Sequence, residues 1–148
     1  MIEWLSIILL SMSPISELRG AIPLGIALGL DPYTVFLVAV LFNILVFFPV
    51  FFVLKFFYYI FERFKIIRDT IEGVRKREKG LVQKYGILAL LIFVAIPLPL
   101  TGAWTGTIIA WLLGLDWRKS LTAISLGVLI AGIVILFVTL SGLKLLGG

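Results

Sequence analysis

Glu17 and Arg19 are the residues of this sequence whose types and spacing most directly suggest chemistry. They lie in residues 13–23, which also hold two prolines and two serines, and the sequence on either side is almost wholly apolar. A carboxylate beside a fixed cation could couple a carrier to protons, because burial and the cation act in opposite directions on its proton affinity. The planar, permanently charged guanidinium of Arg19 suits a phosphate or carboxylate group.

Two structural interpretations stand beside this functional one. Glu17 and Arg19 could pair with each other, or Glu17 could cap the helix that follows it through the helix dipole. Residues two apart on a regular helix point away from each other, so a direct pair requires an irregular turn, which Pro14 permits. In each case unpaired polar groups are costly in hydrocarbon, so the stretch must be buried in protein or line a wet cavity.

A second stretch, residues 96–106, has two prolines like the first but carries no charge. Its threonines offer hydroxyls, and its tryptophan could be a gate or could fill space between two helical hairpins. Helices that start near Ser16 and Thr101 would aim partial positive charge at a common point, which favours an anionic group there. The single asparagine either pairs with a neighbouring helix, the commoner case, or contacts substrate. The candidate substrate-binding or proton-binding residues are Pro14, Ser16, Glu17, Arg19, Asn43, Pro97, Pro99, Thr101, Trp104 and Thr105.

The composition is that of an integral membrane protein. Of the 148 residues 61% are hydrophobic and 14% are charged, with a mean hydropathy of +1.19, whereas about a quarter of a soluble domain is charged. The chain holds no cysteine and no histidine, so we expect no thiolate or imidazole chemistry, no metal site and no cofactor. Asp31 and Asp116 each precede a long apolar run, where helix capping explains them. Without a catalytic set, we expect a protein that is not an enzyme.

The apolar runs predict an all-α protein in which short helices alternate with long ones. Residues 1–12 and 87–96 are expected to be short helices, followed by second short helices over 20–30 and 105–113. A helix of 12 residues is about 18 Å long, too short to cross a hydrocarbon core of about 30 Å. Spanning helices are expected over residues 33–61, kinked near Pro49, and over residues 121–140.

Residues 62–85 hold most of the charge and predict one basic amphipathic helix. Apolar residues recur three and four positions apart from Ile60 to Tyr85, which is the period of a helix with one apolar face. An excess of Lys and Arg places this connector in the cytoplasm, near anionic lipid. We expect no nucleic-acid partner, because no nucleic-acid-binding motif accompanies the charge.

An internal repeat organises the whole chain. Residues 28–31 recur as residues 113–116, and the same offset pairs Pro14 with Pro99 and aligns two ridges of small residues. We therefore expect a single membrane domain with repeat units at about 1–61 and 86–148, joined by the connector 62–85. If each pair of short helices is a re-entrant hairpin, each unit crosses the membrane once, the second unit is inverted and both termini lie outside. Alternatively, each broken helix crosses once, which gives four spans.

Residues 17–23 and 97–106 resemble the two signature stretches of the small multidrug export protein family. The resemblance covers nearly the whole chain, and that family is similar to the wider DedA superfamily. It implies two facing re-entrant hairpins and transport, with proton-dependent transport and lipid movement among the activities linked to the superfamily. DedA relatives usually carry a basic residue in the second hairpin, whereas residues 93–106 of this chain are uncharged.

These observations predict a secondary transporter of the cell membrane, and Glu17 could couple its transport to protons. Its substrate would be small or lipidic, and an anionic one fits Arg19. A different class of function is a scaffold or lipid-sensing protein that acts through residues 62–85. A ridge of small residues, Ala123, Gly127 and Ala131, could pack the chain's own hairpin or admit a helix of a second copy. We expect a homodimer or a higher homo-oligomer.

Overall fold

The computed structural model describes residues 1–76 and 79–147, and it describes the side chains of these ranges outside residues 79–82. In these ranges every regular element is helical. The helices are α1 (Ile2–Met12), α2 (Glu17–Ala27), α3 (Pro32–Leu45), α4 (Phe47–Phe61), α5 (Lys65–Lys76), α6 (Lys79–Ala95), α7 (Ala103–Leu112) and α8 (Trp117–Gly147).

The first three helices pack against one another, and the local sequence explains where each helix begins or ends. Helix α1 ends at Met12 because Ser13, which precedes Pro14, has extended backbone. Helix α2 ends before Gly29, whose φ of +80° is in the left-handed region that glycine adopts without strain. Helix α3 starts at Pro32, and Asp31 caps it by accepting hydrogen bonds from the amide and the hydroxyl of Thr34 at 2.8 and 2.7 Å.

The last three helices repeat this local chemistry 85 positions later. Gly114 ends α7 with a φ of +67°. Asp116 then caps α8 by accepting hydrogen bonds from the amides of Arg118 and Lys119, both at 3.0 Å. The amide of Leu115 donates to the carbonyl of Ala110 at 3.0 Å, as the amide of Leu30 donates to Gly25 at 3.1 Å. At these helix ends the two repeated segments therefore fold alike.

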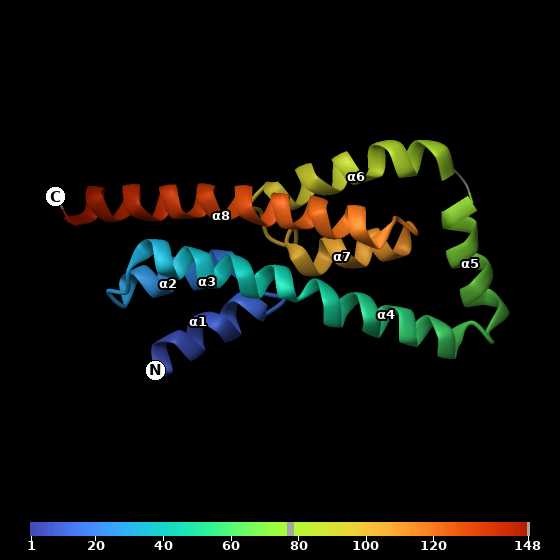
Figure 1. The fold of residues 1–148 in the computed structure, drawn as a ribbon, viewed down its shortest axis with the longest axis horizontal. Helices are drawn as coiled ribbons and strands as arrows, with labels where there is room; N and C mark the ends of the chain where they lie inside the picture. Colours follow the sequence, from blue (N-terminus) through green and yellow to red (C-terminus); the bar gives the residue numbers. More distant parts are fainter. Residues whose placement is uncertain (77–78, 148) are drawn as a thin grey trace.

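The two helical hairpins, α1–α2 and α6–α7, point toward each other from opposite ends of an elongated molecule (Figure 1). Their connecting turns meet near its middle, where hydrogen bonds join them. The start of α1 and the end of α8 lie at one end of the molecule, and α5 lies at the other (Figure 1).

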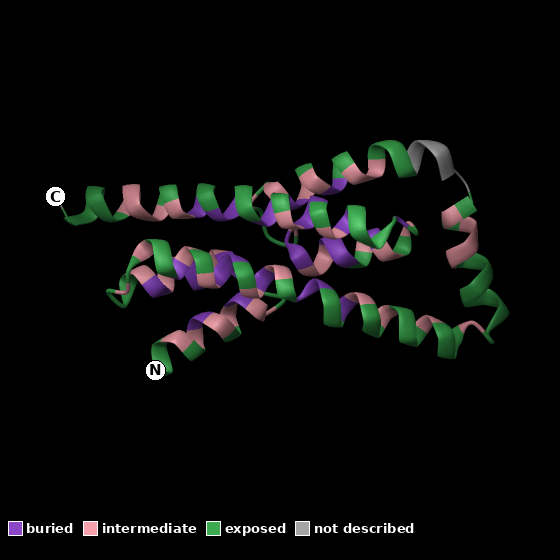
Figure 2. Ribbon diagram, viewed as in Figure 1, coloured by how far each residue is buried: buried purple, intermediate pink, exposed green. Residues whose placement is uncertain are grey.

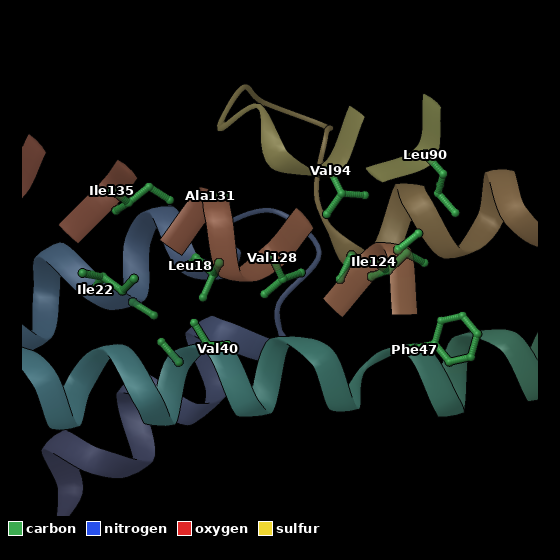
Figure 3. Close-up of a cluster of buried hydrophobic side chains, with 14 of the residues drawn as sticks. Leu18, Ile22, Val40, Phe47, Leu90, Val94, Ile124, Val128, Ala131 and Ile135 are labelled. Carbon is green, nitrogen blue, oxygen red and sulfur yellow. The ribbon is translucent and has the colours of Figure 1, made fainter. Parts of the chain in front are cut away.

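Helix α8 buries one stripe over the part from Ser120 to Ile135. Its buried residues recur every three or four positions from Ser120 to Ile135 and pack against α6, α2 and α3. Figure 2 shows the buried positions gathered on the inward faces of the helices. Figure 3 shows how side chains from both halves interdigitate there, with Leu18 and Ile22 of α2 beside Val128 and Ala131 of α8.

Two helical stretches are long and apolar enough to cross a membrane. They are Pro32–Phe61, which comprises α3 and α4, and Trp117–Gly147, and only 33% of each apolar window is buried. Their outward faces present large apolar side chains such as Phe52 and Phe137, which are 60% and 72% exposed. A soluble monomer rarely exposes such continuous apolar surface, so these features fit a membrane protein.

The expected kink near Pro49 is confirmed: the first spanning run is interrupted at Val46, because Pro49 cannot donate to the carbonyl of Leu45 one turn earlier. Other helix boundaries depart from expectation. Residues 62–85 are not one helix: α5 occupies only residues 65–76, and residues 79–85 open α6. Residues 77–78, which fall within the expected helix, lie outside the described residues. The expected second short helix over 87–96 thus starts eight residues earlier, because α6 packs along α8 whereas α5 contacts α7.

The ridge of small residues on α8 packs the chain's own helices. A Cβ atom added at Gly127 would lie 2.8 Å from Cβ of Val94 and 3.0 Å from the carbonyl oxygen of Leu91, both on α6. Ala123 and Ala131 are likewise buried. The ridge is therefore occupied within one protomer and offers no free face to a second copy. Homo-oligomerisation stays a prediction that must rest on other surfaces.

Candidate functional site

The connection within each hairpin is called a turn here, with residues 13–23 as the first turn and residues 96–106 as the second. Glu17 is a buried carboxyl group at the point where the two turns meet. It is only 5% exposed, and it begins α2 with a φ of +49°, in the left-handed region that side chains other than glycine rarely adopt. Its Oε1 atom accepts a hydrogen bond from the backbone amide of Trp104 at 3.4 Å. That amide is one of the unpaired donors at the start of α7, so Glu17 caps a helix of the other hairpin. Glu17 also lies in the first turn of its own helix, α2, so the interpretation that it interacts with the dipole of that helix stays a prediction.

Gly102 allows this approach because it has no side chain. A Cβ atom at Gly102 would overlap the carboxylate of Glu17. The hydrogen bond from Trp104 is long, so close packing on Gly102 and the dipole of α7 add to what holds the carboxylate in place. Position 102 precedes α7 as its N-cap residue, and it makes no side-chain capping bond of its own. Glu17 supplies that acceptor from the first turn.

Arg19 makes the second contact between the turns. Its Nη2 atom donates a hydrogen bond to the hydroxyl of Thr101 at 2.9 Å. The same hydroxyl accepts from the amide of Leu98 at 3.1 Å and lies 2.7 Å from the carbonyl of Leu98 and 2.5 Å from that of Ile96. The Thr101 hydroxyl thus forms hydrogen bonds within the second turn and one hydrogen bond to Arg19 of the first hairpin. Glu17 and Arg19 form no ion pair with each other in the described structure.

Trp104 closes the junction with a third contact. Its indole Nε1 donates to the carbonyl of Met12 at 2.9 Å. That carbonyl belongs to the last turn of α1, where helical carbonyls lack partners within the helix. Each hairpin therefore satisfies polar groups of the other, and the outward positions of the turns, such as Ile15 and Leu98, are exposed and apolar.

A small cavity of about 10 Å³ lies beside this junction. It is lined by Glu17, Arg19 and Asn43 together with Gly102 and apolar residues of α6 and α8. Asn43 is 1% exposed and donates from Nδ2 to the carbonyl of Ser11 at 2.7 Å, while its Oδ1 is buried without a hydrogen-bond partner in the described structure. A cavity of this size has room for about one water molecule.

The family of the chain follows from a comparison with known proteins. Residues 17–134, which include both turns, match the model of the family described as "Putative small multi-drug export protein". The chain belongs to this export-protein family. No curated protein and no solved structure matches the chain. The family description agrees with a non-enzymatic membrane protein that handles a small molecule, and the relation to the DedA superfamily stays a prediction.

The structure brings together several of the residues that the sequence singles out in this export-family chain. Glu17, Arg19, Thr101 and Trp104 contact the opposite turn, and Asn43 lines the adjoining cavity. The remaining candidate residues make none of these contacts and do not line the cavity. Pro14 and Pro99 are exposed and Pro97 is half-buried, and Ser16 and Thr105 make no side-chain hydrogen bond within the described residues.

Two parts of the site lie beyond what the sequence indicates. One is the role of Gly102 as the surface on which the Glu17 carboxylate rests. The other is the set of backbone groups that complete the junction, the carbonyls of Ser11 and Met12 and the amide of Trp104. Gly102 directly precedes α7, and no side chain of the second turn caps that helix. An uncapped helix start of this kind is the feature that could have pointed to Gly102.

Proposed function

We propose that this protein is a secondary transporter in which the junction of the two turns is the substrate and proton site. Support comes from the family description of an export protein and from one observation above all. The buried carboxylate of Glu17, in the first hairpin, accepts a hydrogen bond from the N-terminus of α7, in the second hairpin. The two halves are thus joined by groups whose interaction depends on charge, and a proton-coupled carrier can use such an interface to move one repeat against the other.

Protonation of Glu17 would weaken the junction in a defined way. An ionised acceptor forms stronger hydrogen bonds than a neutral one and interacts more favourably with a helix N-terminus. The neutral acid therefore holds α7 less firmly, and the hairpins can separate. Arg19 would then release Thr101 and present its guanidinium to an anionic or polar part of the substrate.

The cavity beside Asn43 supports this role for Glu17. The cavity is lined by Glu17, Arg19 and Asn43, and the Oδ1 atom of Asn43 is buried without a described hydrogen-bond partner. One water molecule there could donate to Asn43 Oδ1 and contact Glu17, which would provide the first step of a proton path. We expect the substrate to be small or lipidic, and the 10 Å³ cavity to be a closed form that widens when the hairpins part.

We further propose that both hairpins are re-entrant and that the two units are inverted. Helices α1, α2 and α7 have 11, 11 and 10 residues, which is about half of what a single crossing needs. Helix α6 has 17 residues, but only its part Gln83–Ala95 is a short apolar helix. Single cysteines can be placed in this cysteine-free chain at the exposed positions Ile2, Leu28, Lys76 and Lys119. We expect an impermeant thiol reagent to label positions 2 and 28 from one side and positions 76 and 119 from the other. Labelling of 2 and 28 from opposite sides would establish the four-span alternative.

The transport proposal is tested by comparing two Glu→Gln variants in liposomes under an imposed pH gradient. Glu17→Gln keeps an acceptor for the Trp104 amide but cannot titrate, whereas Glu3→Gln removes the same charge from an exposed position on α1. We expect uptake of a lipophilic cation, an anionic drug or a labelled lipid that is driven by the gradient in the wild type. Glu3→Gln should retain that uptake and Glu17→Gln should lose it.

Equal flux of each of these probes through the wild type and Glu17→Gln would contradict the proton-coupled site. Loss of function on replacement of the basic residues of 62–85, together with a silent Glu17→Gln, would instead favour the scaffold or lipid-sensing alternative.

A further inference from the structure

A second pocket lies far from the junction of the turns, at the end of the molecule where α4, α5 and α7 approach one another (Figure 1). Its volume is about 430 Å³, and it is distinct from the cavity beside Glu17 because the two share no lining residue. Side chains that line it include Lys55 and Tyr58 of α4, Arg75 of α5, Trp111 of α7, and Asp116 and Trp117 at the start of α8.

Arg75 is held rigidly in this pocket. Its guanidinium carbon lies 5.4 Å from the ring centre of Tyr58 and 5.2 Å from that of Trp111, and Nη2 donates to the carbonyl of Trp111 at 3.0 Å. These contacts orient a cation at the C-terminal end of α7. They do not neutralise it, because Arg75 forms no ion pair with a described residue and its Nε has no acceptor there.

Lys55 adds a second cation on the same lining. It is the only charged residue of α4, whose other residues are aromatic or aliphatic, and it too forms no ion pair within the described structure. An ammonium group on a membrane helix is costly unless it reaches water or a counter-ion. The pocket supplies the place where such a counter-ion would sit between Lys55 and Arg75.

Asp116 does not serve as that counter-ion. Its Oδ1 accepts the backbone amides of Arg118 and Lys119, both at 3.0 Å, and so it is engaged in capping α8. Its carboxylate lies on the pocket wall without an ion pair to Lys55 or Arg75. Among the side chains that the structure describes, Lys55 and Arg75 therefore have no ion-paired counter-charge on the lining.

An apolar hollow continues from the charged pocket. It has a volume of about 220 Å³ and shares Tyr58 and Trp111 with the charged pocket, and its other walls include Leu54, Phe57 and Ile71. An apolar groove next to two unmatched cations, with tryptophan and tyrosine at the border, has the form of a site for an amphiphile at a membrane interface.

We propose that this pair of pockets binds one anionic lipid, with the phosphate between Lys55 and Arg75 and an acyl chain over Leu54, Phe57 and Ile71. A free anion would use the cations but leave the apolar hollow empty, and a neutral lipid would leave the cations unmatched. The site is independent of transport through the turns, since none of its residues belongs to the junction. The bound lipid would fix α5 against α4 and α7.

Native mass spectrometry of the purified protein with added phosphatidylglycerol or phosphatidylcholine of identical acyl chains tests this site. We expect the wild type to retain one phosphatidylglycerol in preference to phosphatidylcholine. Lys55→Gln should weaken that binding about fivefold, the value of one cation near a lipid headgroup. Lys65→Gln makes the same change at an exposed position of α5 that does not line the pockets, and it should bind like the wild type.

Arg75→Gln should add to the effect of Lys55→Gln, but it also removes contacts to α7. Lys55→Gln leaves these contacts intact, so this single variant decides the test if the Lys55→Gln/Arg75→Gln double variant does not fold. Equal retention of the two lipids by the wild type would overturn the proposal, and so would an equal loss in Lys65→Gln. Displacement of the lipid by inorganic phosphate at the concentration of the lipid would identify a free-anion site instead.

Discussion

The two turns at the middle of the molecule are related by the sequence repeat, yet they divide the chemistry between them. The first turn contributes the charges, a carboxylate at Glu17 and a guanidinium at Arg19. The second turn is uncharged and contributes one hydroxyl, at Thr101, and the free amide end of α7. Each charged group of the first turn thus meets a neutral dipole of the second.

In the proposed mechanism, this difference would allow two related halves to form a contact that a proton can release. Two turns that each carried a carboxylate and a guanidinium could form ion pairs with each other, and two uncharged turns would have nothing to titrate. A charge held by dipoles can be released by a single proton, whereas a buried ion pair would cost more to break.

The largest effect is expected from filling the space between the turns. Gly102→Ala would place a methyl group where the Glu17 carboxylate lies. That carboxylate is buried, so it has little freedom to move aside. We expect a loss of about 3 kcal/mol in stability, at the upper end for overpacking, and separation of the hairpins. Thermal unfolding in detergent, followed by circular dichroism, measures the first effect.

Gly142→Ala is the matched control for that substitution. Gly142 lies within α8, and a Cβ atom there would meet nothing within 4 Å. Since alanine is a better helix former than glycine, this variant should be stabilised by up to about 1 kcal/mol. Equal behaviour of the two variants would mean that the Glu17 carboxylate does not rest on Gly102.

A smaller effect is expected from removing the hydroxyl that accepts from Arg19. Thr101→Val keeps the shape of the side chain but leaves the Arg19 guanidinium and the Leu98 amide without this acceptor. We expect a loss of about 1–3 kcal/mol. In a double-mutant cycle with Arg19→Gln, the two changes should be non-additive by at least about 0.5 kcal/mol.

Thr122→Val serves as the control, because the exposed Thr122 bonds only to the carbonyl of Arg118 in its own helix. It should change stability by less than about 0.5 kcal/mol. Strict additivity of Arg19→Gln and Thr101→Val would argue against a bond between the two turns.

The smallest effect concerns the two aspartates that occupy equivalent positions in the halves. Asp31 lies just outside the first spanning segment, and hydrogen bonds from the Thr34 hydroxyl and then the Thr34 amide hold its pKa below its ordinary value of 3.8. A lowered pKa in the folded state means that the cap stabilises the fold above pH 3.8 and that this stability is lost as the pH falls through the folded-state pKa.

Asp31→Ala should therefore lower the unfolding temperature slightly at neutral pH, and the difference from the wild type should vanish in acid. Asp31→Asn keeps a neutral acceptor, so it should depend less on pH. A difference between wild type and Asp31→Ala that persists unchanged in strong acid would show that the carboxylate is not the cap.

The sequence predicts the repeated local features well and the contacts between the halves poorly. The motif shared by residues 28–31 and 113–116 encodes its own turn and cap within a few residues, so both copies fold as expected. The partners of Glu17 lie more than 80 residues away in the chain, and neither hydropathy nor spacing identifies Gly102 or the Trp104 amide.

The connector was mispredicted for a related reason. Its apolar period continues from Ile60 to Tyr85, but tertiary packing decides where the helices end. Helix α5 lies against α7 through Arg75, whereas α6 must align with α8, so one straight helix cannot satisfy both contacts. Periodicity reports which face of a helix is apolar, and it does not report where the helix must turn.

The most direct test of the switch is the distance between the turns as a function of pH. Spin labels at the exposed positions Ile15 and Leu98 report this distance by pulsed electron resonance in liposomes. We expect the wild type to gain a longer-distance population when the pH is lowered, and Glu17→Gln to show that population at neutral pH as well. An identical distance distribution for the wild type at both pH values, with the fold intact, would contradict control of the junction by Glu17.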